Sequence, residues 1–361
     1  MRKSYIDNIK WITVMIVVIY HVIFMYNGFV SFGVIGAFSD KVQYQDAFMY
    51  FVYPWFMLLL FTVSGMNTAF YLKNHTHKEF IKSRTRKLLV PSTIGLIIWC
   101  WATGYYNMKI SGAFEQMSAV PKPILFLIMA VSGTGTLWYI QVLWLFSVFI
   151  VLFRKIEKNR LYNICEKINV PTLILFTAII WASAQILNTP VIVVYRFGIY
   201  GAGFLIGYLV LSHDNVMDRL EKWWLPLSIS AVICCVVFTV MYWGKNYADH
   251  EVLDTLMCNI YAWIDTLAVL AFMKKWGGFE NSFSKLMIKK SWGIYIFHYL
   301  PLVATAYYMH TYAKNLSEIL IYLLTGISAL AVSILMNEII SRIPILKWCI
   351  LGIGGKKKNV C

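Results

Sequence analysis

Lys10 and His21 are the two side chains of the first apolar segment whose types and spacing suggest chemistry. They are eleven positions apart, so in a helix at ~100° per residue they fall within ~20° of each other, on one face, and ~16 Å apart along the axis. Asp7 falls near the same face. Imidazole changes charge near neutral pH, which makes His21 a natural proton acceptor. This face therefore suits a long substrate with an anionic head at Lys10 and a reactive far end at His21.

Both residues also have a purely structural interpretation. His21 lies ~18 Å into the segment, past the middle of a membrane, where a neutral histidine satisfied by a neighbouring helix is equally compatible with the sequence. Lys10 lies at the edge of the segment, and its position is also typical of a lysine whose ammonium group snorkels to the interface.

Other ionisable residues lie inside apolar segments, where they are costly and therefore candidates for function. His298 is predicted to lie only ~10 Å deep, so it need not meet the same reacting atom as His21, and a structural or secondary role is predicted for it. Arg196, near the outer end of its segment, would bind an anionic acceptor or face the outer headgroups. Asp265 is mid-membrane and has no partner close in sequence.

A basic loop over residues 78–91 precedes the third apolar segment. Arg84, Arg86 and Lys87 lie within four residues of one another. A bias of positive charge toward the cytoplasm explains part of this density. Guanidinium and ammonium groups so close together also suit the binding of phosphates.

The composition is that of a membrane protein. Of the 361 residues, 60% are hydrophobic and 14% are charged, against ~25% charged in soluble domains. Several apolar runs reach the ~20 residues that cross a ~30 Å hydrocarbon core. We therefore predict an all-α polytopic bundle of about ten transmembrane helices, forming a single domain over 1–361. The predicted spans are 9–30, 48–72, 89–106, 136–153, 171–187, 191–211, 223–243, 252–273, 291–311 and 318–341.

The net charge of +15 is explained by topology and not by nucleic acid. With the N-terminus in the cytoplasm, the 32 Lys and Arg divide into 26 in the predicted cytoplasmic segments, five in the outer loops, and Arg196 within a span. The C-terminus, with its Lys356–Lys358 tail, is then also cytoplasmic, and the first span is not a cleaved signal. The seven cysteines show neither zinc-ligand spacing nor a disulfide framework, so no metal is predicted.

Two shorter features carry structural predictions. The stretch 107–135 holds too few consecutive apolar residues to span, and predicts a short re-entrant or interfacial helix that ends at Gly133 and Gly135. Gly203 and Gly207 form a small-xxx-small pair that lets another helix approach closely. Trp138, at the start of the fourth span, is typical of an interfacial anchor.

The order of five motifs resembles acyltransferase family 3, the bacterial membrane enzymes that acylate surface and secreted carbohydrates. The matches run from residue 7 to about 301. In chain order they are Asp7-Asn8-Ile9-Lys10 with His21, Phe61-Thr62-Val63-Ser64-Gly65, the basic string 84–91, Leu137-Trp138-Tyr139-Ile140, and Ser291-Trp292-Gly293-Ile294-Tyr295-Ile296-Phe297-His298. Lys10 and Lys87 depart from the pattern, which more often has Arg there. Lysine supplies the positive charge but cannot form the paired hydrogen bonds of an arginine guanidinium. This difference would affect how tightly the donor binds or which donor is used.

The resemblance implies a function and a location. It implies an acyl-CoA donor that enters from the cytoplasm, with its phosphates held by Lys10, Arg84, Arg86 and Lys87. His21 would be the catalytic base, and a carbohydrate hydroxyl would accept the acyl group on the outer side of a bacterial cytoplasmic membrane. Acetyl is the default acyl group and succinyl, on periplasmic glucans, is the alternative; no tightly bound cofactor is implied. A transporter or flippase without covalent chemistry is the rival interpretation, and the oligomeric state stays open.

The charge count predicts the sidedness of two loops. A reporter fused after Cys361 should behave as cytoplasmic, and one inserted near Lys245 should behave as external. Reporter activity at both positions measures this, and the same side for both would show that the number of spans is wrong by one.

Overall fold

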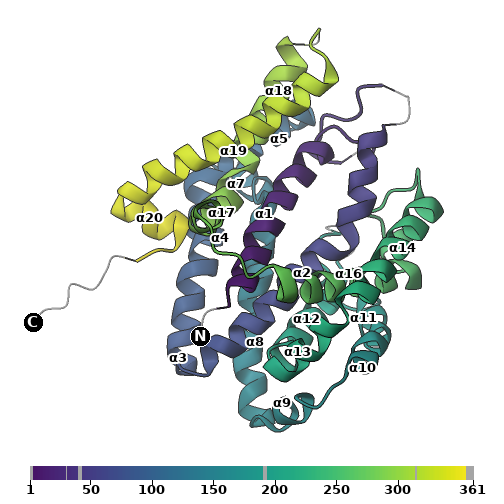
Figure 1. Ribbon diagram of the computed structural model, residues 1–361. Helices are drawn as coiled ribbons and strands as arrows, with labels where there is room; N and C mark the ends of the chain where they lie inside the picture. Colours follow the sequence, from purple (N-terminus) through teal and green to yellow (C-terminus); the bar gives the residue numbers. More distant parts are fainter. Residues whose placement is uncertain (1–2, 30, 40–42, 190–192, 314, 355–361) are drawn as a thin grey trace, which may run out of the picture. The chain divides into compact units, whose positions relative to one another are not determined.

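The computed structural model describes residues 3–354 apart from 30, 40–42, 190–192 and 314 (Figure 1). Within these residues every regular element is a helix, and an isolated bridge joins Asn188 to Arg196. The all-α prediction is therefore confirmed. The basic tail Lys356–Lys358 lies outside the described residues.

Seven helical stretches in the described residues are long and apolar enough to cross a membrane. The chain is therefore a polytopic membrane helical bundle. The seven are α1 (Ser4–Phe24), Tyr44–Leu72 with α2 (Ala47–Leu72), His77–Ile110, Gly135–Glu157 with α8 (Trp138–Glu157), α14 (Trp224–Tyr242), α16 (Leu256–Trp276) and α19 (Glu318–Arg342). The long stretch His77–Ile110 comprises α3 (His77–Arg84), η2 (Thr85–Leu89), α4 (Val90–Gly95), η3 (Leu96–Cys100) and α5 (Trp101–Ile110).

Three of the ten predicted spans are built from shorter helices. Val170–Ala184 comprises α10 (Val170–Leu175) and α11 (Thr177–Ala184), and Phe197–Leu211 comprises α12 (Phe197–Ile206) and η5 (Gly207–Leu211). The predicted span 291–311 is two helices, α17 (Ser282–Phe297) and α18 (Tyr299–Tyr312), that meet at His298. Pro301 lacks the N–H that would bond the carbonyl of Phe297, which weakens the ladder at this junction. The number of crossings and their orientation remain predictions.

The remaining helices are short connections. They are η1 (Tyr44–Asp46), α6 (Ala113–Gln116), α7 (Lys122–Ser132), η4 (Gly135–Leu137), α9 (Arg160–Cys165), α13 (Asp214–Lys222), α15 (His250–Leu253) and α20 (Pro344–Leu351). The predicted short helix within 107–135 is α7, which ends at Gly133 as expected.

The chain divides into two compact units. Unit 1 is Met1–Thr13, Ala47–Ile81 and Leu145–Ile288, and unit 2 is Val14–Asp46, Lys82–Trp144 and Lys289–Cys361. In unit 1, α2 packs on α12 and α16. A Cβ on Gly207 would meet the backbone carbonyl of Thr62, and one on Gly203 would lie 2.5 Å from Leu58, so the predicted small-xxx-small contact is confirmed.

In unit 2, glycines allow the same close packing between α5 and α7. A Cβ on Gly104 would meet the carbonyl of Met129, and one on Gly133 would meet the carbonyl of Cys100. Because neither glycine carries a side chain, the two backbones lie in direct contact. The unit also packs α18 against α19 and α5, and α20 against α4.

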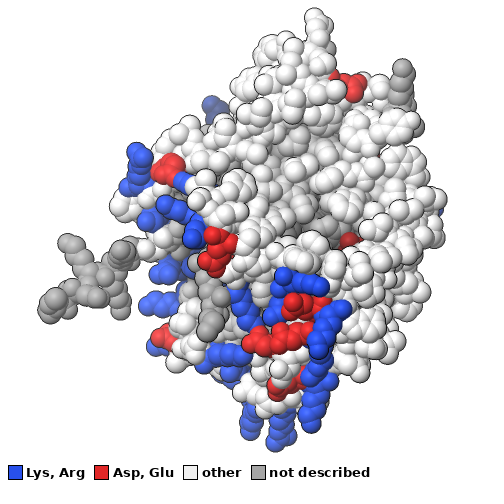
Figure 2. All heavy atoms as spheres, in the orientation of Figure 1, with Lys and Arg blue, Asp and Glu red and all other residues white. Residues whose placement is uncertain are grey.

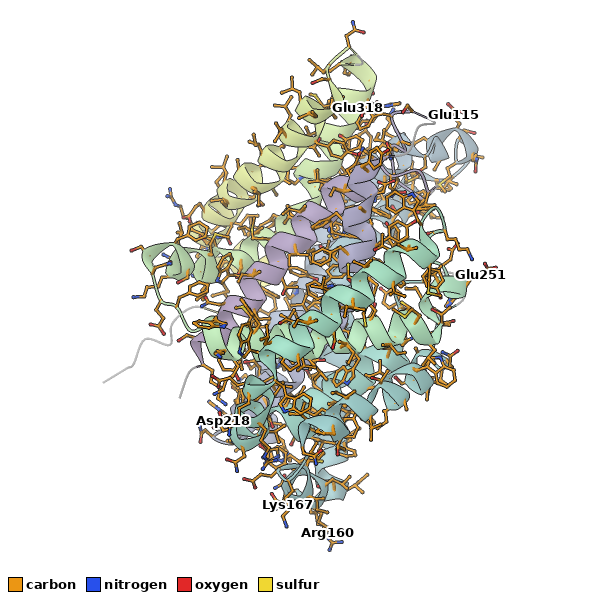
Figure 3. All side chains as sticks on the ribbon, turned by 45° about the vertical axis from the view of Figure 1, so that its right-hand side comes forward. Glu115, Arg160, Lys167, Asp218, Glu251 and Glu318 are labelled. Atoms are coloured by element: carbon orange, nitrogen blue, oxygen red, sulfur yellow. The ribbon has the colours of Figure 1, made fainter. Side chains whose placement is uncertain are left out.

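The charged side chains of unit 1 that Figure 3 labels lie at its two opposite ends. Arg160, Lys167 and Asp218 lie at one end, whereas Glu251 lies at the other (Figure 3). Figure 2 shows Lys and Arg gathered over the end that holds α9 and α13. This separation is the one that the predicted topology requires, since α9 and α13 belong to predicted cytoplasmic segments and α15 to an outer loop.

Candidate active site

The structure brings His21 and His298 together within unit 2. The Nε2 atom of His298 lies 3.3 Å from the Nδ1 atom of His21, and the ring centroids are 5.3 Å apart. The two imidazoles therefore lie at the same level, and not at the different depths predicted from the sequence. The predicted start of this helix is too late. Because α17 begins at Ser282 and not at 291, His298 lies ~24 Å from the start of the helix.

The start of α17 has a local cause. Asn281 caps it, since its side-chain Oδ1 accepts from the backbone N–H of Ser284 at 2.7 Å. Lys290, which lies just before the predicted span 291–311, forms an ion pair with Glu338 of α19 and so is accommodated inside the helix.

Hydrogen bonds define the tautomers of the two rings. His298 is fully buried, and its Nδ1 lies 2.9 Å from the carbonyl oxygen of Ile294 and 3.0 Å from that of Tyr295. Carbonyls only accept, so Nδ1 of His298 carries the proton and its Nε2 is an acceptor. In the neutral pair, the contact between Nε2 of His298 and Nδ1 of His21 is a hydrogen bond only when His21 carries its proton on Nδ1. The ring of His21 also lies within hydrogen-bonding reach of the backbone carbonyl of Val17. With the proton on Nδ1, Nε2 of His21 keeps a lone pair for a base.

Aromatic side chains surround the histidine pair. Tyr299 meets the His21 ring edge-on, at 5.3 Å between centroids, and Tyr20 does so at 5.2 Å. Gly135 has φ +46°, and a Cβ there would lie 3.1 Å from the ring of Tyr299. The absence of a side chain at Gly135 thus lets this turn press against the aromatic wall.

A second contact joins the same turn to α17. The hydroxyl of Tyr295 donates to the carbonyl of Thr136, and the Thr136 hydroxyl donates to the carbonyl of Tyr295 at 3.4 Å. Trp138 follows directly as the first residue of α8, and its neighbour Tyr139 lies 5.9 Å from the ring of Tyr295. Trp138 therefore lies beside the turn that supports the site. Sequence reasoning did not identify Tyr295, Tyr299 or Gly135 as site residues, although the Ser132–Gly135 string marked a turn.

Three of the four predicted phosphate-binding residues, Arg84, Arg86 and Lys87, form a basic cluster in the same unit as His21. Arg84 ends α3, while Arg86 and Lys87 lie on the π-helical turn η2 and are exposed. In the described part of the chain neither Arg86 nor Lys87 forms an ion pair with an acidic side chain. Their charges are therefore available to an anion.

Packing from three sides supports the cluster. Trp144 donates its indole N–H to the Thr85 hydroxyl at 3.1 Å, and Trp292 donates to the carbonyl of Leu351 at 3.0 Å. Gly352 has φ +64° and lies against the backbone of Arg86, and a Cβ on Gly354 would lie 2.8 Å from the Arg86 guanidinium. The end of α20 thus passes directly over the basic turn.

The other predicted site residues belong to unit 1. Lys10 forms an ion pair with Asp7 at 3.2 Å and lies on the same uninterrupted helix, α1, as His21. Ser64 lies half-buried in α2. Arg196, the residue before α12, is buried and donates from Nη2 to the carbonyl of Leu253 at 3.1 Å and to Asp254 at 3.3 Å. Asp265 is buried in α16.

Comparison with known families identifies the family of the chain. The acyltransferase domain of family 3 matches residues 3–338. The chain therefore belongs to acyltransferase family 3 and is a membrane acyltransferase. No curated protein and no solved structure matches it.

Because Nε2 of His298 accepts a hydrogen bond from His21, two substitutions of His298 should give different results. Gln at 298 keeps an oxygen that can accept the Nδ1–H of His21, so His298→Gln should retain measurable acyl transfer. Leu has about the same size but no acceptor, so His298→Leu should lower kcat roughly tenfold to a hundredfold, the value of a hydrogen bond to a group that becomes charged. KM for the donor should change little in either variant.

Single-turnover rates and donor titrations of the two variants, inserted normally into the membrane, measure this. Equal losses in both variants would contradict a role that depends on an acceptor at this position.

Proposed function

We propose that the protein transfers an acyl group from a cytoplasmic acyl-CoA donor to a hydroxyl of a carbohydrate on the outer side of the membrane, with His21 as general base. The observation that carries this proposal is the hydrogen-bonded pair of His21 and His298. A buried base needs a defined tautomer and a free lone pair, and the contacts of His298 provide both.

The proposed reaction conserves protons without a further reagent. The acceptor hydroxyl gives its proton to Nε2 of His21 as its oxygen attacks the thioester carbon, so that the new C–O bond forms. The C–S bond then breaks, and the proton on Nε2 passes to the departing sulfur of coenzyme A. Throughout, the Nδ1–H of His21 remains donated to His298, which holds the ring in place and stabilises the imidazolium between the two steps.

The donor is proposed to bind by its phosphates. Arg84, Arg86 and Lys87 form the basic cluster in the same unit as His21, and an adenine nucleotide with several phosphates is a natural ligand for two exposed, unpaired cations beside a third. Lys10 adds a cation on the helix that carries His21, and the ~16 Å between them suits the flexible arm that separates the phosphates of coenzyme A from its sulfur.

The acyl group and the acceptor follow from the family. Acetyl is the proposed group, and succinyl is the alternative because proteins that succinylate periplasmic glucans share these motifs. A bacterial cytoplasmic membrane is the proposed location. In this scheme the acyl group crosses the membrane during the reaction, while coenzyme A stays on the cytoplasmic side.

Loss of the imidazole separates chemistry from binding. His21→Ala should still bind donor but should lose kcat by roughly 10²–10⁴-fold, the usual contribution of a general base. Single-turnover transfer and donor titration on one preparation measure the two effects. His310, an exposed histidine in the same unit, provides a control: His310→Ala should transfer at the wild-type rate. A fully active His21→Ala enzyme would exclude the mechanism and leave His21 as a structural histidine.

Lys10, near the other end of α1, should affect donor binding and not the chemical step. Lys10→Ala should raise KM for the donor with little change in kcat, because a contact equal in ground and transition states is lost. Lys10→Arg should keep or improve affinity, since Arg offers a bidentate fork. Lys78, exposed on α3, is the matched control. A large fall in kcat for Lys10→Ala with KM unchanged would argue that Lys10 does not act through the donor.

A further inference from the structure

Asp265 is a buried carboxyl that the proposed reaction does not use. It lies near the middle of α16, an apolar helix long enough to cross the membrane, and is 6% exposed. Its Oδ2 is buried and has no hydrogen-bond partner among the described residues. A charged oxygen in this position would be unsatisfied.

Three of the helices packed on α16 carry no charged side chain in the described residues. In unit 1, α16 contacts α2, α11, α13, α14 and α15. Of these, α2, α11 and α14 run beside it (Figure 1). Between their bounds, none of the three contains Asp, Glu, Lys, Arg or His. In the described chain no ion pair reaches Asp265.

The charged neighbours of α16 lie at its two ends. At the C-terminal end, Lys274 pairs with Asp218 of α13 at 3.0 Å, and Lys275 follows it. The same helix α13 also carries Asp214, Arg219, Glu221 and Lys222. Lys274 is nine residues from Asp265, ~13.5 Å along the axis. At the N-terminal end, α15 carries His250 and Glu251, and Asp254 contacts both His250 at 3.2 Å and the buried Arg196 at 3.3 Å. None of these ends reaches the middle of the helix.

The titratable groups that face the carboxyl are neutral. They are Cys234 of α14 and Tyr261, one turn earlier on α16, whose hydroxyl donates to the carbonyl of Phe51 at 2.5 Å. Cys235 lies beside Tyr261. A thiol and a phenol cannot neutralise a carboxylate, and an ionised carboxylate without a partner is disfavoured in the membrane interior.

We propose that Asp265 is a proton-binding site in unit 1. Its carboxyl is protonated in this conformation, and the packing of α14 on α16 holds the proton in place. Release of the proton to water would leave an unpaired charge, so it requires this contact to loosen. Proton occupancy at Asp265 is thereby coupled to the packing of two helices, independently of acyl transfer.

Infrared difference spectroscopy of the protein in lipid vesicles tests the protonation state directly. A protonated carboxyl and a carboxylate absorb at different carbonyl frequencies. At neutral pH, the spectrum of Asp265→Asn should lack a protonated-carboxyl band that the wild-type spectrum contains. Asn has no carboxyl group but is neutral and of the same shape, so the surrounding packing should be kept. Loss of carboxylate bands would overturn the proposal. Glu338→Gln is the control: its carboxylate pairs with Lys290, so this variant should lose carboxylate bands.

Exchange into D₂O tests whether the site binds its proton reversibly. The band assigned to Asp265 should shift as deuterium replaces the proton, and a band that never shifts would show a sealed structural carboxyl and overturn the proposal. Should Asp265→Asn fail to fold, Asp265→Glu keeps the carboxyl on a longer side chain and should shift the protonated-carboxyl band. If Asp265→Glu shifts only carboxylate bands, the proposal is equally overturned.

Discussion

The hydrogen bond between His21 and His298 is the interaction on which the site depends. One N–H lies between the two neutral imidazoles. The carbonyls of Ile294 and Tyr295 bind the other N–H of His298, so the N–H between the rings belongs to His21. Because those carbonyls take the Nδ1–H of His298, the direction of the whole chain of hydrogen bonds is set from the backbone of α17. The lone pair of His21 that the proposed reaction needs is a consequence of this direction.

Several local features of unit 2 position the histidine pair and the basic turn. The break between α17 and α18 places His298 at a junction, where its ring reaches back to the last turn of α17. The turn at Gly135 and Thr136 holds Tyr295 and Tyr299 in position around the rings. The basic turn η2, covered by Gly352 and Gly354, provides two cations that form no ion pair with the described acidic side chains, in the same compact unit. A site for a proton and a site for an anion are thus built into one part of the chain.

Sequence reasoning reached the helical class, the short helix α7 and the close approach at Gly203 and Gly207, because apolar length and small residues report directly on helix packing. It failed for the depth of His298, since that depth was counted from a span predicted to begin at 291, whereas α17 begins at Ser282. The ion pair between Lys290 and Glu338 is a tertiary contact that no local pattern reports. The burial of Arg196 against Asp254 was hidden for the same reason: the two residues are far apart in sequence.

The tautomer of His21 is the most direct test of this account. In ¹⁵N NMR spectra of protein labelled at histidine, protonated and bare ring nitrogens are distinct, and comparison with His21→Ala assigns the signals. The account predicts that resting His21 carries its proton on Nδ1 and none on Nε2, and that His298→Leu disturbs this preference while His298→Gln preserves it. A resting His21 protonated on Nε2, or on both nitrogens, would contradict its role as the base.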